Sequence, residues 1–288
     1  MRFLQIGNAH TKNERGFELL AKEANAILDK EYNPTTQYDL IWIPTGFYHS
    51  NQIPNAKKLL FGPHNFVFPS EPWTLDIPFE KSTYTCLSPW VKEEYNKFKP
   101  LCMPTKPIPF PVDVDRFSPT IHEKTVECFI YFKGRERKLQ RYIQQDLQEK
   151  NISFVNVEYG NYKEEEYIEI LKKVKFGIWV GCHESQGFAL EEALSMDIPL
   201  LVLNVKTMHD EVNHEGNHSY IEYKDTYDLK ATTCSYWDER CGEIIYELSE
   251  LEEGLEKIRG KNYKPREFII ETLSPKICYE RLRTGINL

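Results

Sequence analysis

The chain has 288 residues, of which 41% are hydrophobic, 13% aromatic and 28% charged, as in an ordinary globular protein. This composition excludes a disordered, collagen-like or coiled-coil chain, and the length favours two compact domains. The formal net charge is -8, from 36 basic and 44 acidic residues. Such a balance argues against general nucleic-acid binding, which needs a basic surface facing the phosphates.

The sequence shows no targeting or membrane-spanning segment. Its first residues lack the basic segment, apolar run and cleavage site of a secretory signal. No apolar run approaches the roughly 20 residues that a membrane-spanning helix needs. The seven cysteines are widely spaced without a CxxC pair, which argues against a disulfide framework or a zinc site. We therefore expect a cytoplasmic protein with reduced thiols.

Short apolar segments alternate with helical segments along the first hundred residues. Continuous apolar runs between helices are typical of buried parallel strands. Ser88 and Pro89 form a helix-start signal. We predict strands at 2–6, 40–43, 58–61 and 84–87, and helices at 15–28 and 90–98.

The stretch from 100 to 119 differs in composition, with six prolines in twenty residues. Proline at this density favours an extended chain and excludes helix interiors. We interpret the stretch as a linker between two domains.

Alternation resumes after the linker. We predict strands at 128–132, 154–157, 176–180 and 200–205, and helices at 138–150, 163–174, 187–196 and 243–258. Strands and helices that alternate with short connections indicate a doubly wound parallel sheet in each half of the chain.

The most informative stretch is 177–202, where a strand, a loop and a helix follow one another. Backbone N–H groups at a helix N-terminus favour an anion such as a diphosphate, and Gly187 would let it approach closely. Glu184 and Glu192 are eight positions apart, so they can reach opposite ends of an elongated ligand. A carboxylate can accept two hydrogen bonds from sugar hydroxyls at once.

This stretch resembles the Glu-x7-Glu motif of the family-4-like nucleotide-sugar glycosyltransferases, which have the two-domain GT-B fold. The residues in matching register are Glu184, Gly187, Phe188, Glu192, Ala193 and Pro199. Gln186 stands where the family usually has an aromatic residue, and Asp197 where a glycine is common. Neither change removes a side chain that would bind a ligand.

Three further segments resemble the same family. Residues 109–117 are similar to its interdomain segment, with Pro111 in place of a glycine. Residues 88–95 are similar to the strand-to-helix element that ends its first domain, and residues 129–135 to the start of its second domain. The resemblance implies that cations after that strand neutralise the donor diphosphate. The candidates are Lys133, Arg135 and Lys138.

The resemblance implies two Rossmann-like domains with doubly wound parallel sheets that face a cleft. Residues 1–112 would be the acceptor-side domain and residues 113–264 the nucleotide-sugar-binding domain. Residues 265–288 would form a C-terminal helix that crosses back to the first domain. Retention of anomeric configuration, with no metal or other cofactor, is expected.

Two loops complete the predicted site. The resemblance implies that the loop of Tyr159, Gly160 and Tyr162 lies over the nucleotide base, where a ring could stack, while a turn with two packing aromatic residues is the alternative. The loop from Gly7 to His10 follows the first strand and would face the donor phosphates. We predict as donor-binding Gly7, Asn8, Lys133, Arg135, Lys138, Tyr159, Gly160, Tyr162, Ser185, Gln186, Gly187, Phe188 and Glu192. We predict as catalytic Glu184, Arg135, Lys138 and His64.

Two possible metal sites are weaker interpretations. Asp113 and Asp115 form a D-x-D sequence, the metal-binding signature of the GT-A glycosyltransferase fold. A second group of possible ligands has no cysteine partner and is better explained as a polar loop. It comprises His209, Asp210, His214, Glu215 and His218.

The sequence therefore predicts a glycosyltransferase that moves a sugar from a UDP- or GDP-type donor to a carbohydrate acceptor in glycan synthesis. The alternatives are a GT-A-type enzyme that uses Asp113 and Asp115, a GT-B-like nucleotide-sugar epimerase, and a sugar-nucleotide-binding protein without catalysis. An epimerase would need acid–base groups on both sides of the sugar ring.

Overall fold

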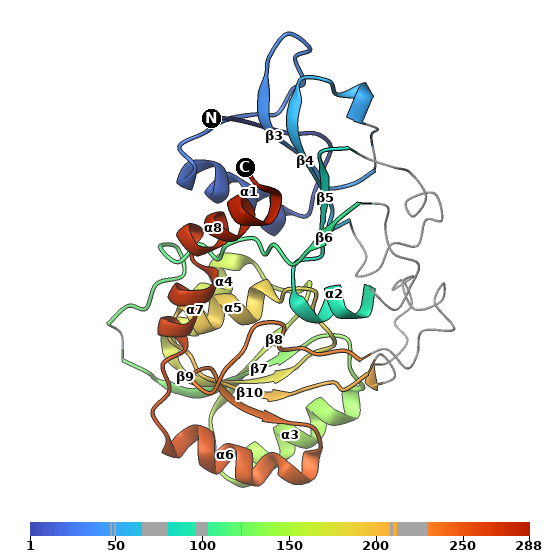
Figure 1. Ribbon diagram of the computed structural model, residues 1–288. Coiled ribbons are helices and arrows are strands. Elements are labelled where there is room, and N and C mark those ends of the chain that lie inside the picture. Colours follow the sequence, from blue (N-terminus) through green and yellow to red (C-terminus); the bar gives the residue numbers. More distant parts are fainter. Residues whose placement is uncertain are drawn as a thin grey trace. The chain divides into compact units, whose positions relative to one another are not determined.

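The computed structural model describes most of the chain, and the described residues form two units. They are 1–46, 48, 50–64, 80–95, 103–121, 123–207, 210–211 and 230–288. Unit 1 contains residues 1–113 and 272–288, and unit 2 contains residues 114–271. Each unit combines helices with one parallel sheet, which confirms the predicted α/β class with two doubly wound domains (Figure 1).

Unit 1 is built on sheet A, whose strands pair in parallel throughout. In sheet order they are β2 (Ile27–Asp29), β1 (Arg2–Gln5), β3 (Tyr38–Ile43), β4 (Ala56–Phe61), β5 (Ser82–Thr85) and β6 (Thr105–Lys106). The register places Leu4 beside Asp29 on one side and beside Ile41 on the other. The chain adds β2 on one side of β1 and β3 on the other side. The carboxyl ends of β1 and β3 therefore flank the switch point of this sheet.

Unit 1 also contains helices. They are α1 (Thr11–Glu23), α2 (Pro89–Tyr95) and α8 (Pro275–Ile286), together with the 3₁₀ turn η1 (Ser50–Gln52). Helix α1 begins at His10, whose ring accepts a hydrogen bond from the backbone N–H of Lys12. Fully buried Phe17 of α1 packs on Trp42, which in turn contacts Phe110 edge-on.

Unit 2 is built on sheet B, whose strands also pair in parallel. In sheet order they are β11 (Gly242–Ile245), β10 (Leu200–Leu203), β9 (Val174–Val180), β7 (Val126–Phe132) and β8 (Phe154–Glu158). The central strands are nearly continuous apolar runs because helices bury them on both faces.

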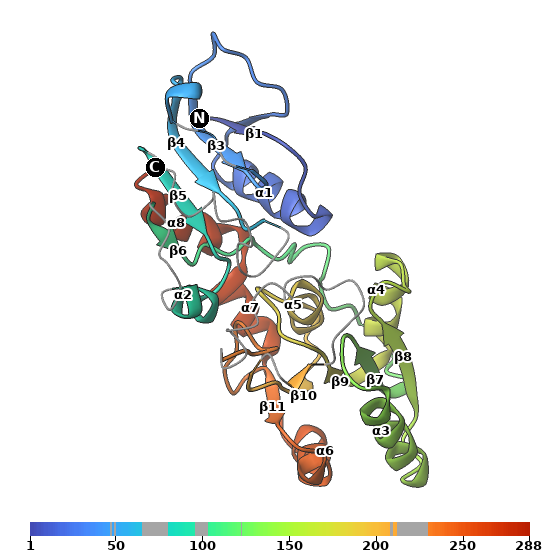
Figure 2. The ribbon, with the colours of Figure 1, turned by 90° about the vertical axis from the view of Figure 1, so that its right-hand side faces the viewer.

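The helices of unit 2 lie on opposite faces of sheet B (Figure 2). Helices α3 (Arg137–Glu149) and α6 (Leu251–Gly260) cover one face, and α4 (Glu164–Lys173) and α5 (Phe188–Ser195) cover the other. On the first face, Ile143 and Leu147, four positions apart in α3, point into a core formed with alternate strand residues. The short turn η5 (Leu248–Glu250) precedes α6, and α7 (Pro265–Leu273) precedes α8.

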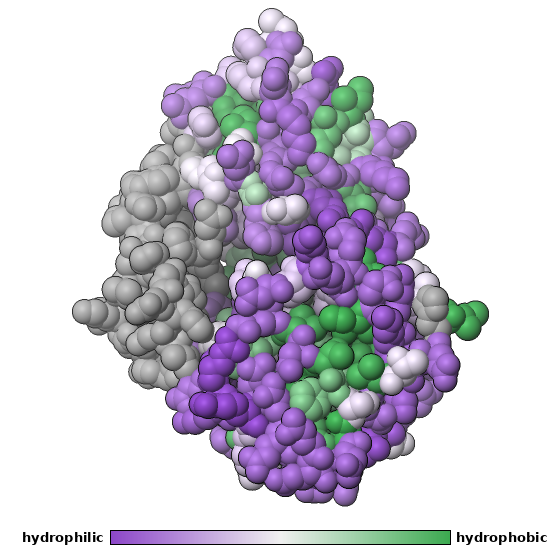
Figure 3. Space-filling model, turned by 180° about the vertical axis from the view of Figure 1, so that it is seen from behind, coloured by the Kyte–Doolittle hydropathy of each residue, from purple (hydrophilic) through white to green (hydrophobic). Residues whose placement is uncertain are grey.

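The visible surface is largely hydrophilic, with smaller hydrophobic areas (Figure 3). Arg116 forms ion pairs with Glu164 and Glu165 at 2.7 and 2.8 Å. Within the described residues, no helix combines the length and apolar character that crossing a membrane requires. The cysteines that the structure describes are free, at positions 86, 128, 182, 234, 241 and 278.

Several predicted elements differ from the observed ones. The helix predicted at 15–28 starts earlier and ends at Glu23, so that Ile27–Asp29 forms edge strand β2. Residues 243–245 belong to strand β11 rather than to the predicted helix, because residues 242–245 pair with β10. The proline-rich stretch contributes strand β6 to sheet A and buries Phe110 and Val112. Proline fixes an extended chain, and an extended chain can also pair at a sheet edge.

The glycine at position 177 of β9 allows the close packing of its neighbours. A Cβ atom there would lie 2.3 Å from the Phe129 ring and 2.7 Å from a Leu200 methyl group. We expect Gly177→Ala to lower the free energy of unfolding by about 1–3 kcal/mol, because overpacking forces the neighbours to shift. Denaturant unfolding would measure the loss.

The matched control is Gly260→Ala at the end of α6. Nothing lies within 4 Å of a Cβ atom at that position. This variant should be as stable as the parent or slightly more stable. Equal stability of the two variants would contradict the packing explanation.

Candidate functional site

The candidate site lies at the carboxyl edge of sheet B in unit 2. The chain passes from β7 to β8 on one side and reaches β9 on the other side of β7. Ligands of open α/β sheets bind at such a switch point, beyond the carboxyl ends of the strands. Lys133 directly follows β7, Tyr159 directly follows β8, and Glu184 lies shortly beyond β9. The topology therefore gathers three predicted site residues.

Lys133 and Glu184 form an ion pair at this edge. The Lys133 Nζ atom lies 2.7 Å from Glu184 Oε1, and the two side chains are 21% and 14% exposed. Burial, the largest single effect, lowers the pKa of Lys133, but the Glu184 carboxylate together with Cys182 and Tyr159 outweighs it, so the pKa is raised. The same ammonium lies 4.5 Å from the centre of the Tyr159 ring. Lys133 is thus a fixed positive charge at the switch point.

Glu192, on α5, is the second glutamate of the predicted motif. It is only 3% exposed, so it is buried rather than part of a solvated helix face. The charges of Glu192, Lys133 and Glu184 all act on the Tyr162 hydroxyl, whose pKa is raised mainly by burial. All three charged groups therefore lie within electrostatic range of Tyr162.

The neighbouring Glu191 is fully buried and differs from these two carboxylates. Its Oε2 atom accepts a hydrogen bond of 3.0 Å from Gln186 Nε2, while its Oε1 atom has no hydrogen-bond partner. Burial raises its pKa well above the ordinary value, and the charges of Glu192 and Glu184 raise it further. Burial therefore disfavours the charged form of Glu191.

Helix α5 presents its N-terminus at the same edge. Gly187 precedes the helix with φ +97°, a left-handed conformation that L side chains rarely adopt. The first intrahelical bond runs from the N–H of Glu191 to the carbonyl of Gly187. The N–H groups of Phe188 and the next residues therefore have no partner within the helix and can receive an anion. Ser185 lies half-buried in the loop before the helix.

A segment around 232–235 supports the loop of Glu184, and sequence reasoning missed it. The N–H of Glu184 donates to the carbonyl of Thr232 at 3.0 Å, and the Ser235 hydroxyl donates to the carbonyl of Glu184. Asn204, just beyond β10, holds the segment by bonds to the N–H of Thr233 and to the Thr232 hydroxyl. Polar residues in an irregular segment carry no periodic signal that would have revealed this role.

Arg135 and Lys138 occupy different surroundings from Lys133. Arg135 is 8% exposed, and its Nη1 atom donates to the carbonyls of Gly181 and Leu203. It therefore ties the carboxyl ends of β9 and β10 together from within. The side chain of Lys138 is 72% exposed on α3 and pairs with Glu136. The structure does not bring Lys138 to the Lys133–Glu184 pair.

The two tyrosines of the predicted base loop also differ. Tyr159 is 53% exposed, so its ring is accessible. The Tyr162 ring packs on Tyr131 and Tyr167, and Tyr131 stacks on Trp179 with ring centres 3.8 Å apart. Gly160 between them has φ +81° and open space around it. Tyr159 is therefore the residue of this loop that can stack on a ligand.

Comparison with known proteins reveals similarity in structure. Neither a protein-family model nor a curated protein matches the sequence. Sucrose-phosphate synthase from Thermosynechococcus elongatus matches with a TM-score of 0.57 and 11% identity, over 100% of this chain and 98% of that one. The lipopolysaccharide outer core galactosyltransferase WaaB matches with a TM-score of 0.56 and 10% identity, over 100% and 99%. This chain has the GT-B fold.

A third neighbour is larger than this chain. TarM from S. aureus matches with a TM-score of 0.51 and 13% identity, over 86% of this chain and 55% of that one. The chain thus spans about half the length of TarM. All three neighbours are GT-B glycosyltransferases, and at these identities they establish the fold alone.

The GT-B fold bears on the metal sites considered from the sequence. The GT-A alternative is wrong in its fold, because both units contain a parallel sheet of their own. Asp113 follows the buried Val112 and is half-buried, and Asp115 is exposed in the turn at 114–116. Asp210 accepts bonds from the N–H groups of Lys206 and Thr207. The other members of that group, His209, His214, Glu215 and His218, lie outside the described residues.

Unit 1 of the GT-B fold places its predicted residues at the carboxyl edge of sheet A. Gly7, with φ +89°, follows β1, and its Cβ position would lie 3.5 Å from the Thr45 hydroxyl beyond β3. That hydroxyl donates to the carbonyl of Asn8. His64 follows β4, and its N–H donates to the carbonyl of Pro44. A cleft that sets Gly7 opposite Glu184 stays a prediction.

His64 packs against Tyr84 within unit 1. The two rings stack with centres 5.5 Å apart, and His64 Nδ1 lies 3.0 Å from the Tyr84 hydroxyl. Burial lowers the pKa of His64 to about 4, although the Gly46 backbone acts in the opposite direction. The imidazole is therefore neutral at pH 7.

This depressed pKa predicts a pH-dependent stability. Unfolding restores the ordinary pKa of about 6.5, so the stabilising effect is present above that value and is lost as the pH falls towards 4. Between pH 7.5 and 5 the parent should lose about 2 kcal/mol more unfolding free energy than His64→Gln. Urea unfolding at both pH values measures the difference. Identical losses in the two proteins would show that His64 does not titrate on unfolding.

Proposed function

We propose that this chain is a family-4-like glycosyltransferase that transfers a sugar from a nucleoside diphosphate donor to a carbohydrate acceptor. The observation that carries the proposal is the Lys133–Glu184 ion pair at the switch point of sheet B, beside the N-terminus of α5. Glu184 and Glu192 would be the two glutamates of the Glu-x7-Glu motif. Their shared position near Lys133 supports this assignment.

The donor would lie along the carboxyl edge of sheet B. Its diphosphate would accept hydrogen bonds from the N–H groups at the start of α5 and from the Lys133 ammonium. Gly187 would let a phosphate oxygen approach the backbone, and the exposed Tyr159 ring would stack on the base. Glu192 and Glu184 would accept hydrogen bonds from ribose and sugar hydroxyls.

The reaction would break the bond between the sugar and the diphosphate. Negative charge develops on the departing phosphate oxygen, and a cation held beside that oxygen lowers the barrier. Lys133 and the helix N–H groups would supply this stabilisation, so the proposed reaction needs no divalent metal. Arg135 would act on the same loops by positioning them, because its guanidinium bonds to the carbonyls of Gly181 and Leu203. Retention of the anomeric configuration is part of the proposal.

Unit 1 would receive the carbohydrate acceptor. Gly7 and Asn8 form a loop at its switch point that would leave room for substrate, and His64 follows a neighbouring strand of the same edge. Neutral His64 could accept a hydrogen bond from an acceptor hydroxyl. The protein would act in glycan synthesis in the cytoplasm.

A UDP-type donor is the part of the proposal that one neighbour supports. The TarM structure contains UDP, alpha-GlcNAc-glycerol and fondaparinux, so this architecture can hold a uridine nucleotide with sugar ligands. We therefore choose UDP as the probe for this chain.

Replacement of Glu192 tests the recognition of hydroxyl groups. Glu192→Gln removes the charge while keeping the shape of a side chain that is 3% exposed. UDP or UDP-glucose should bind about 10- to 150-fold more weakly, equivalent to 1.5–3 kcal/mol for a charged hydrogen bond. Isothermal titration calorimetry with both ligands measures this loss. A loss with UDP assigns Glu192 to ribose, and a loss with UDP-glucose alone assigns it to the sugar.

Glu191→Gln is the matched control on the same helix. Glu191 is fully buried and bonds to Gln186, and glutamine keeps the shape of its side chain. The proposal assigns no ligand contact to Glu191, so the affinities should stay unchanged. Unchanged affinity for both ligands in a folded Glu192→Gln protein would overturn the motif assignment.

Replacement of Lys133 tests the recognition of the diphosphate. Lys133→Met should weaken UDP binding by about 10- to 150-fold while leaving uridine binding nearly unchanged, because only UDP carries the charge that Lys133 would contact. The control Lys138→Met, on the exposed face of α3, should change neither affinity.

Loss of Lys133 leaves Glu184 without its cation, which could destabilise unit 2. The double variant Lys133→Met, Glu184→Gln removes both charges. Because Glu184 is itself proposed to bind hydroxyl groups, this variant is compared with Glu184→Gln alone, and the comparison isolates the effect of Lys133. Equal weakening of UDP and uridine in both proteins would contradict a contact with the diphosphate.

A further inference from the structure

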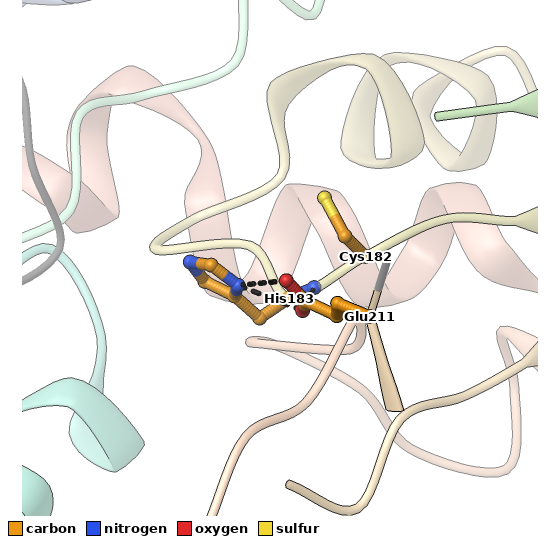
Figure 4. A group of neighbouring side chains, drawn as sticks. All are labelled: Cys182, His183 and Glu211. Atoms are coloured by element: carbon orange, nitrogen blue, oxygen red, sulfur yellow. Dashed lines mark hydrogen bonds and ion pairs between the residues drawn. The ribbon is translucent and has the colours of Figure 1, made fainter. Parts of the chain in front are cut away.

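Three side chains that can bind metals lie together at the carboxyl edge of sheet B. Cys182 and His183 follow β9, and Glu211 lies in the chain beyond β10 (Figure 4). Their candidate ligand atoms, the Cys182 sulfur, an imidazole nitrogen and a carboxylate oxygen, all lie within 4.8 Å of one another. Cys182 and His183 are each 7% exposed, and the Glu211 side chain is 2% exposed. This is a buried group that the proposed donor site does not use.

Glu211 already holds His183 in a fixed orientation. Its two carboxylate oxygens lie 2.7 and 2.9 Å from His183 Nδ1, and Oε1 also accepts the backbone N–H of His183. The far edge of the imidazole points away from the carboxylate (Figure 4). Nitrogen and oxygen ligands around one tetrahedral zinc ion are about 3.3 Å apart, given bonds of roughly 2.0–2.2 Å. If His183 Nδ1 and the Glu211 oxygen moved apart by about half an ångström, a cation could take the place of the hydrogen that they share.

The chemistry of the three groups selects among cations. A thiolate, an imidazole and a carboxylate are ligands of zinc, whereas magnesium and calcium prefer oxygen ligands alone. Burial raises the pKa of the Cys182 thiol to about 12, Lys133 lowers it, and Glu184 and Glu211 raise it further. The repulsion between a thiolate and the Glu211 carboxylate would become attraction to a divalent cation placed between them.

Two nearby cations oppose this binding, and both have partners. Lys133 is paired with Glu184 at 2.7 Å, and Arg135 donates to the carbonyls of Gly181 and Leu203. The charge of Arg135 also acts on Glu211. A divalent cation at this group would therefore bind against the repulsion of these two positive charges.

We propose that Cys182, His183 and Glu211 bind one zinc ion, with a water molecule as the fourth ligand. The ion links the loop after β9 to the chain beyond β10, and so it fixes the backbone immediately before Glu184. It lies beside the proposed diphosphate site and takes no part in breaking the sugar–phosphate bond. The ligands come from two loops without a CxxC pair, which is why cysteine spacing does not reveal them.

Cobalt(II) is the probe, because a thiolate bound to it gives a charge-transfer band in the near ultraviolet. The purified full chain, freed of metal, is titrated with Co²⁺ and then with Zn²⁺ in the absence of any nucleotide. We expect one Co²⁺ per chain with the thiolate band, and displacement of that band by one equivalent of Zn²⁺. Because no nucleotide is present, the outcome is independent of the proposed glycosyltransferase activity.

Variants identify the ligands. Cys182→Ser should abolish the charge-transfer band, and His183→Gln and Glu211→Gln should each weaken Co²⁺ binding at least tenfold. Cys128→Ser is the matched control, since Cys128 is an equally buried free thiol in β7. It should retain the band, and circular dichroism verifies that each variant is folded.

Three results would overturn the site. They are a parent chain that shows no thiolate band, a band that survives in folded Cys182→Ser, and Co²⁺ affinity that is unchanged in both His183→Gln and Glu211→Gln. If Cys182→Ser fails to fold, Cys182→Ala provides the same comparison, because alanine also removes the sulfur and introduces no polar atom.

Discussion

The ion pair between Lys133 and Glu184 depends on parallel pairing in sheet B. The two residues are 51 positions apart, and they meet because β7 and β9 are neighbours whose carboxyl ends share one edge. The N–H of Lys133 even continues the ladder by donating to the carbonyl of Val180. Any loss of register between these strands would separate the charges. The chemistry proposed for this edge therefore rests on the packing of the sheet below it.

Several polar side chains are buried near that edge of sheet B, and hydrogen bonds compensate for their burial. Arg135, Gln186 and Glu191 are each less than one-tenth exposed, and burial of such groups is costly unless hydrogen bonds compensate. Arg135 donates hydrogen bonds to the carbonyls of Gly181 and Leu203. Gln186 donates one to the Glu191 carboxyl group. Burial raises the pKa of Glu191, which disfavours a buried charge at this position. These groups hold in place the loops that carry Lys133 and Glu184.

The sequence could predict the parallel-sheet units because buried strands are continuous apolar runs. It could also predict the neighbourhood of Lys133, Glu184 and Glu192, since residues after parallel strands meet at one edge. It could not predict that Lys138 would lie 72% exposed on α3, because spacing in the chain does not show which way a helix turns its side chains. Edge strand β2 was missed for a related reason. Its three residues are exposed or half-buried, and they lack the apolar run that reveals a central strand.

The two sheets share a strand order but differ in what their switch points carry. In each, the second strand of the unit lies outside the first, and the third lies on the first strand's other side. In unit 1 the residues after those inner strands include the neutral Gly7, Asn8 and Thr45. In unit 2 the corresponding positions hold Lys133 and Glu184, together with the N-terminus of α5. An anionic ligand gains more from fixed charge than from neutral backbone, so a diphosphate favours the edge in unit 2. Under the proposed function, the edge in unit 1 would receive the uncharged carbohydrate acceptor, which hydrogen bonds from neutral groups can hold.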